Sequence, residues 1–437
     1  MRVSATTSDV LIVGAGVIGT SIALQVARSG RSVTVVDKGG GAGHGSTSAS
    51  AAIIRFHYST RAGIATAWES KFCWQNWADF LGHVDPAGMA KFTRTGALVM
   101  DFPGFDTERV LGLYAELGIP FERLTAAGIQ EKFPYVAAGR HYPPKALEDP
   151  AFWDDADAEI GGFWTPEGGF MDDPMLAAHN FLHAAQQEGA RVRFHTTISG
   201  VVREGDRVTG LVTSEGERLE APVVVNAAGP WSTKLNQMAG VLDDFNVTTR
   251  ALRQEVHHVP APPGAGIAQG MPMVADGDLA IYFRPEPGGD ILIGGQEPKC
   301  DPLVWVDDPD DVDVQPTMAV YEAQATRVAR RLPELPVPPR PRGVVGVYDV
   351  SDDWIPILDR TGLDGFYVAI GTSGNSFKSS PVYGQIMATL INACEGGHDH
   401  DHDPVQFTCP RTGLTVDLRH YSRLREVNDK SSFSVMG

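Results

Sequence analysis

The sequence predicts an α/β protein, α+β overall, with two sheet-forming parts. A buried strand, a glycine-rich turn and a helix follow one another at residues 10–30, and the same succession returns at residues 366–394. Between them, residues 251–295 alternate short strands with turns, which is typical of an antiparallel sheet. We therefore expect a parallel sheet with covering helices and a separate second sheet.

The first element group, residues 10–37, predicts a dinucleotide-binding site. It opens with the wholly apolar run Val-Leu-Ile-Val, as expected for a strand covered on both faces. Gly14, Gly16 and Gly19 follow with the G-x-G-x-x-G spacing, which permits a tight turn, a close approach to a pyrophosphate and close helix packing. Asp37 ends the next strand, where a carboxylate can accept hydrogen bonds from ribose hydroxyls. These neighbours favour dinucleotide binding over an ordinary strand-to-helix connection, but they do not distinguish FAD from NAD.

Composition restricts the partners and the compartment. The formal net charge of −18 disfavours nucleic acid and anionic membrane surfaces, whereas a local cationic pocket could still bind an anionic substrate. No apolar run approaches the roughly 18 residues of a membrane span, and residues 1–8 are mostly polar. The four cysteines are scattered without a C-x-x-C pair, which suits reduced thiols. We therefore expect a cytoplasmic protein with no membrane span and no nucleic acid partner, and self-association into a homo-oligomer stays open.

Four further segments have informative patterns. Residues 38–48 are rich in glycine and hydroxyl groups, and such a loop can either wrap a phosphate or act as a mobile linker. Residues 62–81 have a helical pattern with an aromatic stripe, which indicates a core helix. The strand at 223–225 ends in small residues, which lets the backbone approach a ligand at the carboxyl edge of the sheet. Prolines gather at 333–341, which indicates a crossing between the two parts.

Six motifs follow one another along the chain: GAGVIG, GSTSASAAIIR, NAAGPWS, YFRP with ILIGG, GVYDVSDDWIPILD and GTSGNSFKSSP. Together they resemble the D-amino acid oxidase-like (DAO) family of FAD-dependent oxidoreductases, and most of all its sarcosine oxidase, glycine oxidase and proline dehydrogenase group. The resemblance extends from Val10 to about Pro404. It implies FAD as the cofactor, in a Rossmann-like FAD-binding domain that is discontinuous in sequence. It also implies a substrate-binding domain built on a mixed or antiparallel sheet.

The domain boundaries and the FAD contacts are implied by the same resemblance. The FAD-binding domain is expected at 1–90, 160–235 and 343–415, the substrate-binding domain at 91–159 and 236–342, and a C-terminal tail at 416–437. The first glycine turn would hold the pyrophosphate, Asp37 the adenosine ribose, Ile198 the adenine, and the second glycine turn the flavin ring. The predicted cofactor residues are Gly14, Gly16, Val17, Ile18, Gly19, Asp37, Lys38, Ser46, Thr47, Ile198, Ala228, Gly229, Gly374, Asn375, Ser376, Phe377 and Lys378.

Two cations are implied to bind the substrate. In the sarcosine oxidase group, an arginine after paired isoleucines and a lysine after a glycine-phenylalanine turn clamp the substrate carboxylate, and they match Arg55 and Lys378. Two cations at loop ends that face one cofactor would form a carboxylate pocket, although each could instead form a surface salt bridge. Tyr282, Tyr348 and His57 are expected to line the substrate, and His57 suits a hydrogen-bonded structural histidine equally well.

Three departures from this group modify the prediction. Gly346 stands where the oxidases carry the cysteine that bonds to the flavin, so we expect noncovalent FAD. In the strand that carries a lysine thought to promote reaction with oxygen, both candidate positions are apolar, Leu292 and Ile293, which favours a dehydrogenase or a slower oxidase. The turn usually written glycine-histidine-glycine is Gly-Asn-Ser at 374–376, which changes the polarity beside the flavin.

The predicted function is oxidation of the C–N bond of an amino acid, or of a secondary or N-methyl amine, that carries a carboxylate. Hydride transfer to the flavin would give an imine that water hydrolyses, and the electron acceptor would be oxygen or an unknown acceptor. A flavin-dependent 2-hydroxy acid dehydrogenase would use the same clamp, and a partner-dependent flavoprotein subunit would bind FAD without acting alone. Residues 398–403 alternate His with Asp, but side chains that alternate in an unstructured run point apart, so no metal site is predicted.

Overall fold

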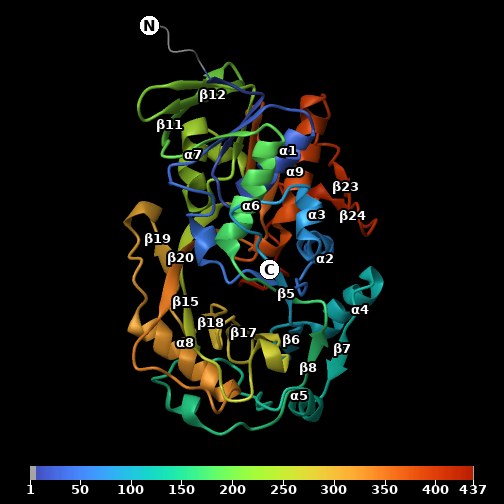
Figure 1. The fold of residues 1–437 in the computed structure, drawn as a ribbon, viewed down its shortest axis with the longest axis vertical. Helices are drawn as coiled ribbons and strands as arrows, with labels where there is room; N and C mark the ends of the chain where they lie inside the picture. Colours follow the sequence, from blue (N-terminus) through green and yellow to red (C-terminus); the bar gives the residue numbers. More distant parts are fainter. Residues whose placement is uncertain (1–5, 437) are drawn as a thin grey trace.

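The computed structural model describes residues 6–436 and has a large sheet toward each end of the molecule (Figure 1). One of these sheets has six strands, of which all neighbours run parallel except the last pair. In spatial order its strands are β10 (Arg191–Arg193), β3 (Val33–Val36), β2 (Val10–Val13), β14 (Val223–Asn226), β22 (Phe366–Ile370) and β21 (Ile357–Arg360). Strands from the start, middle and end of the chain therefore lie side by side, and the α/β fold prediction is confirmed.

Helices cover this sheet because its central strands are apolar and buried. Helix α1 (Val17–Arg28) packs against both α6 (Pro174–Gln187) and α9 (Ser380–Glu395). A β-carbon at Gly384 of α9 would lie only 2.3 Å from Ser21 Oγ, so glycine lets α1 and α9 approach closely. Ser21 Oγ also donates a hydrogen bond to the carbonyl of Ser380 over 2.7 Å. These contacts join the two glycine-turn units from opposite ends of the sequence.

The lower part of Figure 1 is built on a nine-stranded mixed sheet. In spatial order its strands are β19 (Val304–Val306), β15 (Thr249–Pro260), β18 (Asp290–Gly295), β17 (Ile281–Pro285), β16 (Met273–Asp276), β6 (Ala97–Met100), β8 (Gly162–Thr165) and β7 (Glu122–Leu124), with β20 (Gly343–Ser351) paired to β15. Helix α8 (Met318–Arg331) packs on β15, β17 and β18. Its Val328 joins a buried cluster with Phe283 and Ile293, so this sheet has its own apolar core.

The remaining elements are short. The other helices are α2 (Arg61–Gln75), α3 (Trp77–Leu81), α4 (Thr107–Leu117), α5 (Ala126–Lys132) and α7 (Ser232–Ala239). The smaller sheets contain β1 (Thr6–Thr7), β13 (Arg218–Glu220), β12 (Arg207–Thr213) and β11 (Ile198–Glu204); β4 (Ile53–Ile54), β9 (Gly169–Met171) and β5 (Phe92–Arg94); and β23 (Gln406–Thr408) with β24 (Thr415–Asp417). Within residues 6–436, each helix is too short or too polar to cross a membrane.

Two features differ from the sequence-based expectations. The single helix expected over 62–81 is wrong, because Asn76 adopts the non-helical angles φ −115° and ψ 49° and separates α2 from α3. Its side-chain Nδ2 donates to the carbonyl of Phe72 over 3.0 Å. Strands β8 and β20 fall within the segments assigned to the FAD-binding domain but pair in the large sheet, while the domain boundaries themselves stay a prediction.

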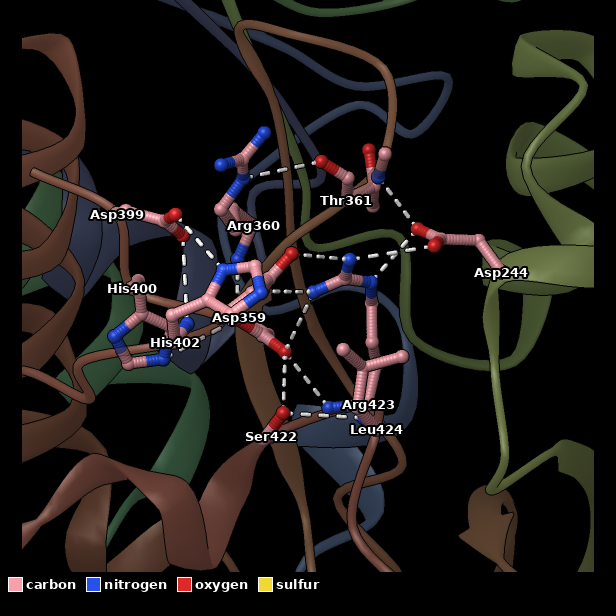
Figure 2. Close-up of polar contacts among 12 residues, drawn as sticks. Asp244, Asp359, Arg360, Thr361, Asp399, His400, His402, Ser422, Arg423 and Leu424 are labelled. Carbon is pink, nitrogen blue, oxygen red and sulfur yellow. Dashed lines mark hydrogen bonds and ion pairs between the residues drawn. The ribbon is translucent and has the colours of Figure 1, made fainter. Parts of the chain in front are cut away.

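The C-terminal segment is tied firmly to the parallel-sheet part. The buried guanidinium of Arg423 donates to Asp244 and Asp359, as Figure 2 shows, and also to Asp401. From this anchor the chain runs back toward the space between the two sheets, where the C label stands near the centre of Figure 1. Residues 435 and 436 there line the cavity described below.

Candidate functional site

A cavity of about 550 Å³ lies between the two sheets. One side is formed by the loops that follow β2, β3, β14 and β22, at the carboxyl edge of the parallel sheet, where open α/β sheets bind ligands. The other side is formed by residues of β16, β17 and β20 from the large sheet. The cavity is therefore built by segments that are distant in sequence, and all of the predicted cofactor and substrate residues except Gly19 and His57 line it.

The first glycine turn leaves the N-terminus of α1 open to the cavity. Gly14 has φ +112°, and a β-carbon there would lie 2.2 Å from the carbonyl oxygen of Ala227. Thr47 Oγ1 accepts a hydrogen bond from the Val17 amide over 3.1 Å and would lie 3.3 Å from a β-carbon on Gly16. At a helix N-terminus the backbone amides and the helix dipole attract a phosphate group. Gly19, a predicted cofactor residue, does not line the cavity. A β-carbon there would lie 1.9 Å from the carbonyl oxygen of Gly14, so glycine lets the helix pack closely against the turn.

The acidic residue that ends β3 holds the glycine turn. Asp37 accepts hydrogen bonds from the backbone amides of Ala15 and Gly39, each over 2.6 Å. Beside it, Lys38 forms an ion pair with Asp310 and lies 3.9 Å from the ring centroid of Trp231. The Asp310 carboxylate comes from the loop after β19, so the large sheet contributes to this exposed end of the cavity.

The second glycine turn shapes the opposite end of the cavity. Gly374 has φ +66°, and a β-carbon there would lie 2.3 Å from the ring of Tyr348. Trp74 of α2 stacks on Phe377 with ring centroids 5.3 Å apart, and its Nε1 donates to the carbonyl of Lys378 over 2.7 Å. The aromatic stripe of α2 therefore fixes the loop that carries Lys378.

All predicted cofactor residues except Gly19 line this cavity. They extend from Asp37 and Ile198 at one end, past the α1 N-terminus, to the turn at 374–378 at the other. The helix N-terminus at the cavity, the glycine turns and the acid that follows β3 match what an extended dinucleotide requires, so the residues present fit FAD. Their individual roles toward FAD stay predictions.

The two predicted substrate cations meet at one aromatic ring. Arg55 and Lys378 are only 5% and 4% exposed. Arg55 Cζ lies 5.0 Å and Lys378 Nζ 5.1 Å from the ring centroid of Tyr58. Lys378 Nζ donates to Tyr58 Oη over 3.1 Å and to the carbonyl of Asn375. Burial lowers the pKa of both cations, and the charge of Arg55 lowers the pKa of Lys378 further.

Neither cation forms an ion pair with a carboxylate among residues 6–436. Arg55 instead donates to three backbone carbonyls, those of His57 over 2.6 Å, Met436 over 3.3 Å, and Val435. The surface salt bridge that was the alternative for each residue is therefore excluded by their burial and partners. Two buried positive charges at one end of a cavity favour an anionic ligand.

The remaining substrate-lining predictions divide. Tyr282 and Tyr348 line the cavity, and burial raises the pKa of both phenols. His57 does not line it: the ring is fully buried and lies edge-on to Phe163, with centroids 6.4 Å apart. Neither ring nitrogen has a hydrogen-bond partner among the described residues, and burial together with the charges of Arg55 and Lys378 lowers the pKa of His57 well below its usual value.

Sequence reasoning missed several residues of the site. Gln296 lines the cavity just after β18, and the adjacent Glu297 binds the cavity residue Val435 through its carboxylate. Val435 and Met436 were assigned to a tail of no stated role. The sequence pattern could have indicated Gln296 and Glu297, because these two polar residues directly follow a buried strand.

The histidine and aspartate run at 398–403 has structural contacts. His402 Nδ1 bonds Asp399 over 2.8 Å, and His400 Nε2 approaches Asp359 to 3.4 Å (Figure 2). Across residues 6–436, no group of three or more His, Cys, Asp or Glu side chains is arranged to hold a metal ion.

Comparisons with known proteins agree with this geometry. The family model DAO, described as FAD dependent oxidoreductase, matches residues 9–390. The FAD-dependent oxidoreductase domain-containing protein 1 of Xenopus laevis is 25% identical over 426 residues, which cover 88% of this chain and 79% of that protein. The mitochondrial sarcosine dehydrogenase of Mus musculus is 28% identical over 246 residues, covering 53% of this chain but only 25% of that protein.

Solved structures share the fold. The crystal structure of L-proline dehydrogenase from P. horikoshii superposes with a TM-score of 0.74 at 22% sequence identity, covering 96% of this chain and 97% of that one. At this identity the likeness establishes the fold alone. The structural similarity extends over both the parallel-sheet part and the large sheet, because nearly the whole of each chain is covered.

Proposed function

Because the chain belongs to the DAO family of FAD dependent oxidoreductases, we propose that it oxidises the C–N bond of an amino acid, or of a secondary or N-methyl amine, that carries a carboxylate. The observation that carries this proposal is the pair of buried cations, Arg55 and Lys378, which both lie near the ring of Tyr58 at the end of the cavity bounded by the 374–378 turn. The sarcosine dehydrogenase among the relatives supports an amine substrate.

In this proposal the residues of the chain orient the substrate. Bound flavin supplies the acceptor of the hydride equivalent. Arg55 and Lys378 bind the substrate carboxylate. Because these contacts are buried, they restrict the position of the adjacent carbon more than contacts at an exposed site would. The apolar and aromatic walls around Tyr282 and Tyr348 exclude water from the reacting carbon. The imine product is hydrolysed by water after the site opens.

Two residues support noncovalent FAD and weak oxygen reactivity. Gly346 provides no sulfur for a bond to flavin, and a β-carbon there would lie 3.0 Å from Ala49 Cβ. Leu292 belongs to the apolar cluster with Tyr282 and Val256, on the cavity side of β18, whereas Ile293 faces the core under α8. We therefore take Leu292, of the two candidate positions, as the equivalent of the lysine of the oxidases, and a leucine there supports a dehydrogenase.

Anaerobic mixing of the FAD-loaded protein with a substrate panel tests the proposal. The panel contains N-methyl amino acids, cyclic imino acids, D-amino acids and 2-hydroxy acids, and flavin bleaching identifies the class that reacts. Bleaching by amines supports the proposal, and bleaching by hydroxy acids alone would replace it with the 2-hydroxy acid dehydrogenase. Failure of every compound, despite bound FAD, would favour the partner-dependent subunit. Arg55→Ala and Lys378→Ala should each weaken substrate binding, and unchanged affinity would mean that the clamp is wrongly placed.

A further inference from the structure

Val435 lies between an arginine and a glutamate at the cavity. Its carbonyl oxygen accepts a hydrogen bond from Arg55 Nη2, and its backbone N–H donates to Glu297 Oε2 over 3.1 Å. Arg55 Nη1 also donates to the carbonyl of Met436. A guanidinium and a carboxylate therefore bind the two backbone groups of a single residue.

The two backbone groups that these partners bind correspond to the two charged groups of an α-amino acid. The N–H and C=O of Val435 are attached to one α-carbon, as are the amino and carboxylate groups of a free α-amino acid. A free amino acid carries full charges at these two places. It would therefore bind Arg55 and Glu297 through charge-assisted hydrogen bonds, which are stronger than those of a neutral backbone.

Glu297 is held in place for such a contact. It follows β18 with φ +48°, a left-handed conformation that is uncommon for residues other than glycine and is found at functional positions. Gln254 Nε2 donates to Glu297 Oε1 over 3.1 Å, so the other oxygen is directed to Val435. Burial raises the pKa of both cavity tyrosines. The charge of Glu297 raises the pKa of Tyr282 next, and it raises the pKa of Tyr348 after the contribution of Tyr282.

We propose that Glu297 binds the amino group of the substrate while Arg55 binds its carboxylate, with the segment 432–436 withdrawing as the substrate enters. This inference rests on the proposed function and deepens it, because the clamp of Arg55 and Lys378 does not recognise an amine. A carboxylate attracts an ammonium ion and accepts its N–H groups, but it repels the lone pairs of an ether oxygen. Glu297 is therefore a determinant of specificity for amines.

The same contact gives the amine a route to its neutral form. Burial raises the pKa of Glu297 to about 8, so its carboxylate is a stronger base than that of an exposed glutamate and can accept a proton from an adjacent ammonium ion. In this step an N–H bond of the ammonium breaks and the proton bonds to Oε2, which leaves a neutral amine and a neutral carboxylic acid. A neutral amine has the free lone pair that formation of an imine requires.

Isosteric pairs of compounds test the assignment on the FAD-loaded full chain. N-methylglycine is compared with methoxyacetate, and L-proline with tetrahydrofuran-2-carboxylate, in which oxygen replaces the N–H. Amine oxidation is followed by anaerobic flavin bleaching, and binding of the unreactive ethers by the shift they cause in flavin absorption. Glu297→Gln should lower kcat/KM for the amine by about tenfold or more and change the Kd of the ether by less than about twofold.

Two further substitutions serve as a rescue and a control. Glu297→Asp keeps the carboxylate in a residue that tolerates positive φ, so it should recover part of the lost amine activity. Glu395→Gln removes a largely buried carboxylate on α9 that binds Arg207 and Tyr367 outside the cavity lining. It should keep the wild-type ratio of amine to ether affinity.

Val435→Pro tests the withdrawing segment without changing Glu297. Proline lacks the N–H that donates to Glu297 Oε2. The segment should therefore compete less with the substrate for Glu297, and the KM for the amine should fall severalfold. This variant also keeps the inference testable if the Glu297 variants fail to hold FAD, because an unchanged KM would overturn the shared position of Val435 and the substrate.

The outcomes separate the inference from the proposed function. If an amine bleaches the wild-type flavin and Glu297→Gln keeps the wild-type kcat/KM, the role of Glu297 is overturned while the proposed function stands. If only hydroxy acids bleach the wild-type flavin, the proposed function fails, and amine binding by Glu297 fails with it. Loss of amine activity with retained ether binding supports both.

Discussion

Replacing Arg423 with methionine should destabilise the protein by about 3 kcal/mol. The guanidinium is 2% exposed and its partner Asp359 is fully buried, so the substitution leaves a buried carboxylate without its cation. Breaking such a pair costs roughly 3–5 kcal/mol. Asp359 keeps hydrogen bonds from Ser422 Oγ at 3.0 Å and from the amide of residue 423 at 2.8 Å, which favours the lower end of this range. The partly exposed Asp244 and Asp401 add less than about 1 kcal/mol each.

Thermal unfolding of the FAD-loaded protein measures this effect. An unfolding entropy of about 2.1 cal/mol/K per residue gives roughly 0.9 kcal/mol/K for this chain, so the melting temperature should fall by about 3 °C. The control is Arg419→Met, which removes an exposed arginine of the same segment and should change the stability by less than about 0.5 kcal/mol. Adding Asp359→Asn to Arg423→Met should restore part of the loss, because it removes the uncompensated charge. Equal melting temperatures for Arg423→Met and Arg419→Met would refute the reasoning.

Three other predictions concern the cavity and the large sheet. A β-carbon at Gly374 would lie 2.3 Å from the ring of Tyr348, so Gly374→Ala should move this ring and shift the visible absorption of bound flavin, and an unchanged spectrum would contradict the contact. Asp310→Asn weakens the contacts with Lys38 and Trp231 at the exposed end of the cavity, so FAD should dissociate faster while the stability changes by less than about 1 kcal/mol. Although burial acts to raise it, the pKa of Glu255 is held at about 2 by hydrogen bonds from His257, Arg253 and Thr317. Its stabilising contribution is therefore present above pH 4.5 and is lost as the pH falls toward 2, so the melting temperature of Glu255→Gln should depend less on pH in this range, and equal slopes would argue against it.

The end of the cavity at the first glycine turn could be predicted from sequence because its determinants are local. Gly14 and Gly16 act through the conformation of one turn, and Asp37 ends the strand that follows the next helix, so their spacing along the chain already specifies their arrangement. Arg55 and Lys378 were identified through motifs, and the structure places both at Tyr58. His57 was misplaced because its sequence neighbours do not show that its ring packs toward Phe163.

Glu297 and Val435 show what the sequence pattern could not supply. Glu297 follows a buried strand, but the pattern does not reveal that this strand end faces Arg55, which is more than two hundred residues earlier in the chain. Val435 lies at the end of a segment in which Arg423 is anchored to Asp244, Asp359 and Asp401, and these partners come from three different segments. Such contacts depend on sheet register and on the path of the backbone, which local periodicity does not encode.

By itself, the sequence determined that the chain forms an α/β fold and that its motifs belong to FAD-dependent oxidoreductases, and it predicted a dinucleotide at the first glycine turn. The tertiary structure decided which side chains meet: two buried cations on one tyrosine, and an arginine and a glutamate that bind the two backbone groups of Val435. The reason is physical. Turns and strands are specified by neighbouring residues, whereas a cavity between two sheets is specified by the packing of segments hundreds of residues apart.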